Sequence, residues 1–264
     1  MIRGLYTAAT GMNAMQQQID VTSNNIANVN TTGFKKDRAE FQDLMYQTLN
    51  YTAGQTSQVT TNPTGIDVGL GVKISGIQKN LTEGDLETTG NDLDIAIAGN
   101  GFFKLEDPST GDELYTRNGI FNIDAETGNL VNGNGYELTP TITIPTVATK
   151  VSIADDGSVT ATDSSGNPVG GTQQIELSDF VNPAGLTPVG NTMFKESPAS
   201  GEAQEENPKT DQYGSILQGS IENSNVSLVT EMVDLITAQR AYEANSKSIT
   251  TTDSMLDTIN RLKS

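Results

Sequence analysis

The side chains of this chain that could do chemistry are its carboxylates, because cysteine, histidine and tryptophan are absent from all 264 positions. Their absence excludes thiolate nucleophiles, Ser-His-Asp triads, iron–sulfur clusters and zinc sites built on cysteine or histidine. Two acidic pairs have the residue types of a general acid and base, namely Asp92 with Asp94 and Asp155 with Asp156. Neither pair comes with aromatic residues for sugar stacking, and the second precedes Gly157, as is typical of a turn. We interpret both pairs as structural.

A further acidic stretch resembles a calcium-binding loop but does not complete one. Asn122, Asp124 and Glu126 alternate as calcium ligands do. The glycine, however, falls at position seven of the loop (Gly128), and position twelve is Gly133, where calcium needs a bidentate acid. The stretch is therefore predicted to be a hairpin turn.

Other ligand classes are disfavoured by composition. The glycine-rich stretches at 69–71 and 99–101 lack the lysine and the strand–turn–helix context of a phosphate-binding loop. A formal charge of −18 disfavours nucleic acid as a partner. No apolar run approaches the length of a membrane span, and no signal-peptide core follows the N-terminus. The sequence predicts a protein that is not an enzyme, with no cofactor, no metal and no small-molecule substrate.

The acidic charge is concentrated in the middle of the sequence. Residues 1–46 hold four basic and four acidic side chains, and residues 226–264 hold four and five, so −17 of the charge lies between them. All nine prolines also lie in this middle part, from Pro63 to Pro208. Nearly neutral, proline-free ends around an acidic, proline-containing middle predict two kinds of structure in one chain.

The N-terminal end carries a heptad pattern that predicts a helix over residues 3–28. Two mostly apolar series recur every seven positions: Leu5, Met12, Ile19 and Ile26, and, three residues later, Ala8, Met15, Thr22 and Val29. The pattern ends at residues 30–33, where Gly33 terminates the helix or opens a turn. Phe34 to Leu49 shows a weaker helical signal.

The C-terminal end repeats this design. Five residues are spaced by seven without a break, namely Leu228, Leu235, Tyr242, Ile249 and Leu256. Met232 and several aliphatic neighbours widen the stripe. An isolated helix hairpin is marginal in water, so we expect the two ends to pair with each other and then with copies of the chain. The alternative is a helix pair packed only on its own globular core.

The middle of the chain predicts antiparallel β-structure, because short apolar runs alternate with Asn-Gly, Asp-Gly and other turn signals. The strands are expected at 94–98, 102–105, 113–116, 120–123, 129–131, 136–139, 141–144, 150–153, 158–162 and 174–177. Residues 51–71 and 195–212 are predicted to be extended or mobile. The fold class is thus α+β, with paired terminal helices in a coiled-coil-like layer, an inserted antiparallel β-domain and long extended arms. Three regions are expected: a helical domain (1–46 with 224–264), an arm or connector region (47–85 with 195–223) and a β-domain (86–194).

Several stretches resemble the bacterial flagellar rod and hook proteins, and together they extend over nearly the whole chain. The most specific is Ser23–Lys35, whose family residues are Asn24, Asn25, Ala27, Asn28, Gly33 and Phe34. The others are residues 101–103, 115–121, 218–226 and 235–245. By length and by its arm the chain is most similar to the distal rod members of this family. A proximal rod protein of similar length is the alternative.

The resemblance implies a structural subunit that self-assembles into a rigid helical tube, transmits motor torque to the hook and encloses the export channel. It implies a place in the basal body, in the rod that crosses the periplasm, and export without a cleaved signal peptide. The implied partners are copies of the chain, proximal rod and hook or hook-adjacent proteins, the P- and L-ring bushing, the type III export apparatus and the rod cap.

The resemblance also assigns roles to residues of this chain. The heptad stripes of both ends are expected to mediate self-assembly, and the arm is expected to stiffen the tube through Tyr46, Tyr51, Pro63 and Gly65. Two other classes of function compete with this interpretation. One is a secreted glycan-acting enzyme on a β-scaffold, and the other is an acidic binding module, which leaves the heptad ends unexplained.

Overall fold

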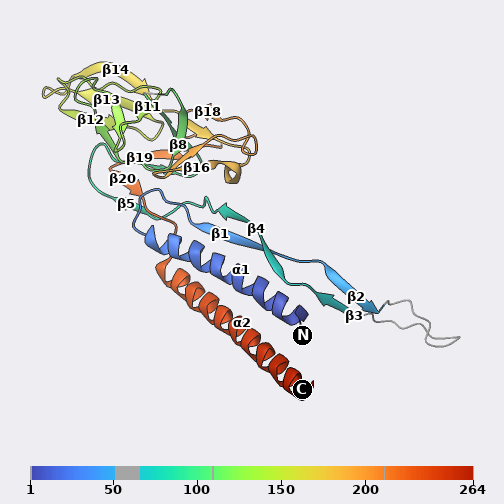
Figure 1. Ribbon diagram of the computed structural model, residues 1–264. Coiled ribbons are helices and arrows are strands. Elements are labelled where there is room, and N and C mark those ends of the chain that lie inside the picture. Colours follow the sequence, from blue (N-terminus) through green and yellow to red (C-terminus); the bar gives the residue numbers. More distant parts are fainter. Residues whose placement is uncertain (1, 51–65, 109, 211, 264) are drawn as a thin grey trace. The chain divides into compact units, whose positions relative to one another are not determined.

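The computed structural model describes residues 2–50, 66–108, 110–210 and 212–263 (Figure 1). The chain forms two compact units, each built from separate stretches of sequence. Unit 1 comprises Met1–Ala27, Asp37–Gln78 and Ser227–Ser264, and unit 2 comprises Asn28–Lys36 and Lys79–Val226. The chain therefore passes between the units four times.

Unit 1 contains the two predicted helices, α1 (Ile2–Ala27) and α2 (Leu228–Lys263). They lie side by side and antiparallel, with both termini at the same end of the pair (Figure 1). At 1.5 Å per residue they are about 39 Å and about 54 Å long. The helices approach closely where small residues face the partner: a Cβ added at Gly11 of α1 would lie 2.8 Å from Nδ2 of Asn245 on α2. The predicted pairing of the two ends is confirmed. Neither described helix has an apolar stretch that could cross a membrane.

Four strands complete unit 1, and they correct the expected helical signal in Phe34–Leu49. β1 (Asp37–Asp43) pairs with β4 (Val72–Lys79), and β2 (Tyr46–Asn50) pairs with β3 (Ile66–Gly69) as an antiparallel arm. Contacts with α1 place β1 along that helix, on the side away from α2 (Figure 1). The first residues of β1 alternate between partly buried and exposed, which is a strand period. Pairing with strands distant in sequence outweighed local helix propensity here.

Unit 2 is the predicted antiparallel β-domain, confirmed and enlarged. Its strands are β5 (Leu86–Thr88), β6 (Ile95–Ala98), β7 (Phe102–Glu106), β8 (Glu113–Thr116), β9 (Phe121–Ile123), β10 (Leu130–Asn132), β11 (Glu137–Thr139), β12 (Lys150–Ile153), β13 (Ser158–Thr162), β14 (Pro168–Gln174), β15 (Leu177–Asp179), β16 (Thr187–Gly190), β17 (Met193–Lys195), β18 (Gln204–Glu206), β19 (Ser215–Gln218) and β20 (Ser220–Glu222). One 3-10 turn, η1 (Pro183–Gly185), interrupts them.

The largest sheet of unit 2 has nine strands. Its main path runs β16-β17-β8-β7-β11-β10-β9, with β15 also paired to β7 and β18 paired to β15. Separate antiparallel pairings join β12-β13-β14, β19-β6 and β20-β5. Side chains from most of these strands form one apolar core, which includes Ile97, Phe103, Leu105, Leu138 and Ile175.

Three details of the β-prediction were wrong. The strand expected at 174–177 is interrupted, because β14 ends at Gln174 and β15 begins at Leu177. Residues 141–144 form no strand, only a bridge from Thr143 to Asn129, because prolines flank the segment and the Gln173 side chain satisfies the Thr143 backbone. The stretch expected to be mobile, 195–212, includes the end of β17 and all of β18, which is paired with β15. The three-region division stays a prediction. The two compact units divide the chain differently, since residues 28–36 and 195–226 belong to the same unit as most of the β-strands.

The two units carry very different charges. Unit 2 holds 23 acidic and eight basic residues, a net −15, whereas unit 1 holds ten and seven, a net −3. Almost all of the negative charge of the chain therefore belongs to the β-rich unit.

A prediction follows from the pairing of β19 and β20 with β6 and β5. A fragment of residues 79–226 should show β-type circular dichroism and a cooperative urea transition. A fragment of 72–195 lacks β18, β19 and β20, so β15 loses one partner strand and Ile97 of the core is uncovered. It should unfold at clearly lower urea concentration. Strong helical signal in the longer fragment, or equal midpoints for the two, would contradict the observed topology.

Candidate functional site

The predicted self-assembly stripes are only partly covered within one chain. On α1, Ala8 and Thr22 are buried between elements of unit 1. The other stripe residues of the two helices fall into two classes: half-buried (Leu5, Met12, Met15, Ile19, Ile26, Leu235, Ile249 and Leu256) and exposed (Leu228, Met232 and Tyr242). Val29 follows the end of α1 and lies half-buried in unit 2.

One apolar face of α2, which includes the stripe residue Met232, is open. Val229, Met232, Val233 and Ile236 are 73%, 50%, 54% and 53% exposed. Their spacing of three and four residues places them on one side of the helix. Beyond the middle of α2, Met255, Ile259 and Leu262 continue to expose apolar surface. We call Val229, Met232, Val233 and Ile236 the open face. Contiguous exposed apolar surface of this kind marks interaction sites.

Asn25, one of the family residues, fastens α1 to its neighbours in unit 1. Its Nδ2 donates to the Asp37 carbonyl (2.9 Å) and to Oε2 of Glu231 on α2 (3.1 Å), and its Oδ1 accepts from the Asp37 amide (2.9 Å). Asn25 and Glu231 are both buried. The side chain thereby aligns the start of β1 and the first turn of α2 against α1. Asn24 and Ala27 of the same motif are exposed.

A buried ion cluster lies at the other end of the same motif, within unit 2. Lys35 Nζ donates to Glu222 Oε1 (2.5 Å) and to the Thr82 carbonyl (2.7 Å). Arg117 Nη1 donates to Glu222 Oε2 (3.2 Å), and the Gly84 amide donates to Glu222 Oε1 (2.9 Å). The side chains of Lys35 and Glu222 are fully buried, and that of Arg117 nearly so. We call Lys35, Arg117 and Glu222 the ion cluster.

Burial governs the electrostatics of this cluster. Loss of solvent lowers the pKa of Lys35, and the adjacent Glu222 carboxylate opposes that shift. Each charge is tolerated because it is paired and hydrogen-bonded, since an unpaired buried charge costs several kcal/mol. The cluster therefore holds together the three segments of the chain that contain Lys35, Arg117 and Glu222.

The glycine of the motif is required by its backbone. Gly33 has a φ of +70°, its amide donates to the Glu222 carbonyl (2.8 Å), and a Cβ there would lie 2.7 Å from the Asn118 amide nitrogen. Only glycine fits this close approach. Next to it, Phe34 is half-buried with the Lys79 ammonium 5.2 Å from its ring centroid, and Asn28 accepts a hydrogen bond from Thr31 (3.2 Å).

The sequence singled out the motif but missed the role of the ion cluster. Lys35, Arg117 and Glu222 are far apart in sequence, and nothing in their spacing indicates contact. The available signal was that each lies in or beside a stretch resembling the same family, so the three most recognisable stretches meet at one buried point.

The acidic patterns have structural roles. Asp94 accepts from Thr89 Oγ1 (2.6 Å) and Asn91 Nδ2 (3.0 Å). Hydrogen bonds from Thr127 and Ser158 lower the pKa of the Asp124 and Asp156 carboxyls, respectively, which is the wrong direction for a general acid. Asp124 sits in the β9–β10 hairpin turn, as predicted. Among the residues that the structure describes, no three acidic side chains are grouped to hold a metal ion.

The arm residues are only partly visible. Tyr46 begins β2 and is exposed, with its ring near Gly69 of the paired strand. Tyr51, Pro63 and Gly65 lie outside the described residues.

Comparison with known proteins matches three stretches to protein families. Residues 5–35 match the flagella basal body rod protein family, residues 96–161 the flagellar hook protein FlgE/F/G D1 domain, and residues 217–262 the flagellar basal body rod FlgEFG protein C-terminal family. Each member of the ion cluster falls in a different one of these matches.

Relatives match over the full length of the chain. It is 46% identical to the flagellar basal-body rod protein FlgG of Agrobacterium fabrum, over 98% of this chain and 99% of that protein. It is 44% identical to the protein of the same name from Borreliella burgdorferi, over 100% and 99%. It is 34% identical to the flagellar hook-basal body complex protein FlhP of Bacillus subtilis, over 100% of both chains.

A prediction follows for the ion cluster. Glu222→Gln keeps the shape of the side chain but leaves Lys35 and Arg117 without a counter-charge, so it should lower the free energy of unfolding by about 3 kcal/mol or more. The control is Glu113→Gln, which breaks the more exposed pair with Lys104 and should cost about 1 kcal/mol or less. Urea titration of the full chain compares the two, and equal midpoints would refute the role of the cluster.

Proposed function

The chain belongs to the family of flagellar basal-body rod proteins, and on that premise we propose that it is a structural subunit of the distal rod. Copies of it would stack into a rigid helical tube that transmits motor torque to the hook and encloses the export channel. The observation that carries this proposal is the open face of α2, on a helix pair whose heptad stripe is only half-buried in a single chain. Because the chain belongs to a family of rod proteins, we infer that other copies of the same chain cover this surface.

The physical reason for assembly is burial of this apolar surface. Removing apolar area from water contributes about 25 cal/mol per Å², so a face of four large side chains repeated in every subunit gives a substantial driving force. A contact between two different patches can repeat from copy to copy, and where the rotation between copies does not close a ring, the repetition gives a helical tube. Unit 1 suits this role because its net charge of −3 offers little repulsion between copies.

The β-rich unit suits a different place in the tube. With a net charge of −15 it favours a hydrated position, which supports the outer wall of the rod over the inner layer. The helices of unit 1 would then line the export channel. The finer parts of the proposal rest on family membership: periplasmic location, export without a cleaved signal, and contact with proximal rod, hook, ring, cap and export proteins. The same membership supports a structural role without catalysis.

The arm is proposed to stiffen the tube. Tyr46 at its base is 60% exposed, and the antiparallel pairing of β2 with β3 gives the arm a defined shape where it is described. Tyr46, an exposed aromatic residue on the β2–β3 strand pair, can contact a neighbouring copy with little loss of side-chain entropy.

Assembly should depend on the open face. Ile236→Asp places a charge where a neighbouring copy would pack, and it should abolish tube formation while helix content stays unchanged, since the side chain is 53% exposed. The control is Val147→Asp, which places the same charge at a similarly exposed apolar position of unit 2, away from α2. Electron microscopy and sedimentation measure assembly. Normal tubes from the Ile236 variant would overturn the proposal.

Stiffness should depend on the arm. Deleting residues 51–65, which join β2 to β3 in the sequence, should give tubes that bend more. The persistence length in electron micrographs measures this directly. Unchanged curvature in the deletion variant would assign rigidity to the helices and the β-rich unit instead.

A further inference from the structure

The heptads of the two helices in unit 1 are compatible with more than one register. Both helices carry apolar residues at a strict spacing of seven. Sliding α2 along α1 by seven residues, about 10 Å, would therefore bring stripe residues opposite one another again. α2 has 36 residues and α1 has 26, so the longer helix has room for such a slip. A feature other than the heptads must select the observed register.

Two contacts between the helices belong to one alignment. A Cβ at Gly11 would lie 2.8 Å from Nδ2 of Asn245, and Asn25 Nδ2 donates to Oε2 of Glu231 (3.1 Å). In both contacts the two residue numbers add up to 256, as one antiparallel register requires. On each helix the two contact residues are fourteen positions, or two heptads, apart. We call Gly11 with Asn245 the notch pair, and Asn25 with Glu231 the buried polar pair.

Small residues lie opposite larger ones along this line of contacts. Asn245 lies over Gly11, and one heptad further along, the same alignment sets the half-buried Gln18 opposite the buried Ala238. A slip in one direction would bring Asn245 opposite Gln18 and crowd two long side chains into one layer. A slip in the other direction would bring Gly11 opposite Ala238 and leave a cavity. The layers therefore fit in one register only.

The buried polar pair adds a second requirement. Asn25 and Glu231 are both buried, and their hydrogen bond joins the two helices. A slip by one heptad in either direction would move Glu231 about 10 Å along α1 and break the bond. Buried polar pairs fix the register of packed helices because every other alignment separates a buried group from its partner.

We propose that the notch pair and the buried polar pair are positioning contacts that together fix the register of α1 and α2. The heptad stripes supply the attraction between the helices, since they bury apolar surface. The two pairs decide which of several equally spaced alignments the helices adopt. They also fix how the exposed residues of one helix are placed beside those of the other.

The register determines how far α2 extends beyond α1. In this alignment Ile2, the first described residue of α1, is level with Ser254. Residues 255–263 of α2 therefore extend beyond it, and they include the exposed Met255, Ile259 and Leu262. A slip by one heptad would lengthen or shorten this overhang by about 10 Å.

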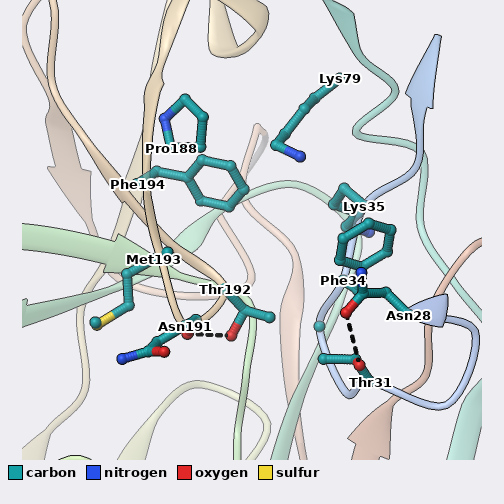
Figure 2. Close-up of a pocket in the computed structure, with 12 residues that line it drawn as sticks. Asn28, Thr31, Phe34, Lys35, Lys79, Pro188, Asn191, Thr192, Met193 and Phe194 are labelled. Atoms are coloured by element: carbon teal, nitrogen blue, oxygen red, sulfur yellow. Dashed lines mark hydrogen bonds between the residues drawn. The ribbon is translucent and has the colours of Figure 1, made fainter. Parts of the chain in front are cut away.

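The chain segments that lead into the helices are a competing explanation for the register. Behind α1, the Thr31 amide and hydroxyl donate to the carbonyl and Oδ1 of Asn28 (3.1 and 3.2 Å) and fix a turn (Figure 2). Before α2, Asn225 Nδ2 donates to the Asn80 carbonyl (2.9 Å). A slip then requires the first turn of α2 to unwind. Gly11, however, is 16 residues from the end of α1, about 24 Å away, where these segments have little influence.

The register can be measured directly, because the chain has no cysteine of its own. Ser23→Cys on α1 and Ser254→Cys on α2, both exposed, carry spin labels for double electron–electron resonance. In the observed register the two positions are about 32 Å apart along the helix pair, and a slip changes this distance by about 10 Å. Labelled chains are diluted with unlabelled ones, so that only distances within one chain are recorded. The otherwise unsubstituted chain should give one narrow peak.

Glu231→Ala combined with Gly11→Leu removes both positioning contacts. The new leucine would collide with Asn245 in the observed register. After a slip it would instead fill the space beside Ala238, and Asn245 would lie opposite Gly4, where an added Cβ meets nothing within 4 Å. The distance distribution should therefore gain a second peak about 10 Å longer than the first.

The matched control makes the same two substitutions at exposed positions of the same helices. It combines Glu243→Ala, which breaks only an exposed pair with Arg240 on α2, with Gly4→Leu. This control should keep the single peak. Glu231→Gln should keep it as well, because the new amide still offers an acceptor to Asn25.

Three results would overturn the inference. An unchanged single peak in the variant with Glu231→Ala and Gly11→Leu would assign the register to the segments that lead into the helices. A second peak about 10 Å shorter would contradict the packing argument, and a broad distribution in the unsubstituted chain would show that no register is fixed. Circular dichroism verifies helix content. If the double variant loses its helices, Glu231→Ala alone leaves both bonds between Asn25 and Asp37 intact and should give the same second peak.

Assembly gives a separate result, which rests on the proposed function. The variant with both contacts removed should form about tenfold fewer tubes than the matched control, because its overhang presents different apolar surface to a neighbouring copy. Normal tubes from a variant whose distance has shifted would refute the role of the overhang. If the unsubstituted chain forms no tubes, the rod function is wrong, whereas the distances still decide the register.

Discussion

The buried carboxylate of Glu222 is the interaction on which the β-rich unit depends. It binds Lys35, Arg117 and the Gly84 amide, which lie in three separate parts of the sequence. Because an unpaired buried charge costs several kcal/mol, these segments cannot separate while the others stay in place. The cluster thereby fixes the turn from Asn28 to Lys36 against the strands. Gly33 is needed at this turn for a steric reason, because any side chain there would collide with the Asn118 backbone.

The two units divide the physical requirements of assembly between them. Unit 1 presents uncovered apolar surface and a net charge of −3, so copies can pack without strong repulsion. Unit 2 buries a well-defined apolar core and carries −15, which keeps its surface hydrated. A stiff tube needs both properties: strong adhesion between subunits in one layer and no unwanted adhesion elsewhere. The inserted β-unit and the terminal helices meet these needs separately.

Sequence periodicity predicted the elements that depend on local order. The heptads of the two ends predicted α1 and α2. The Asn-Gly and Asp-Gly turn signals predicted where most strands in the middle of the chain begin and end. Sequence periodicity did not predict β1 or β4, because their pairing joins two separate stretches, 37–43 and 72–79, and has no short-range signature. It also predicted that stripe residues such as Leu235 and Ile19 mediate self-assembly, which stays a prediction. Both are half-buried in the single chain, and Val229 and Val233 are more exposed. Periodicity identifies an apolar face but cannot say which partner covers it.

The sequence by itself determined the α+β class, the position of the acidic charge, the absence of cysteine and histidine chemistry, and the resemblance to rod and hook proteins. These properties depend on composition and on spacing along the chain. Only the tertiary structure decided that Lys35, Arg117 and Glu222 form one buried cluster, that Asn25 aligns β1 with α2, and which side of α2 stays open. The physical reason is that burial and ion pairing depend on distances between residues far apart in sequence, and those distances exist only once the chain has folded.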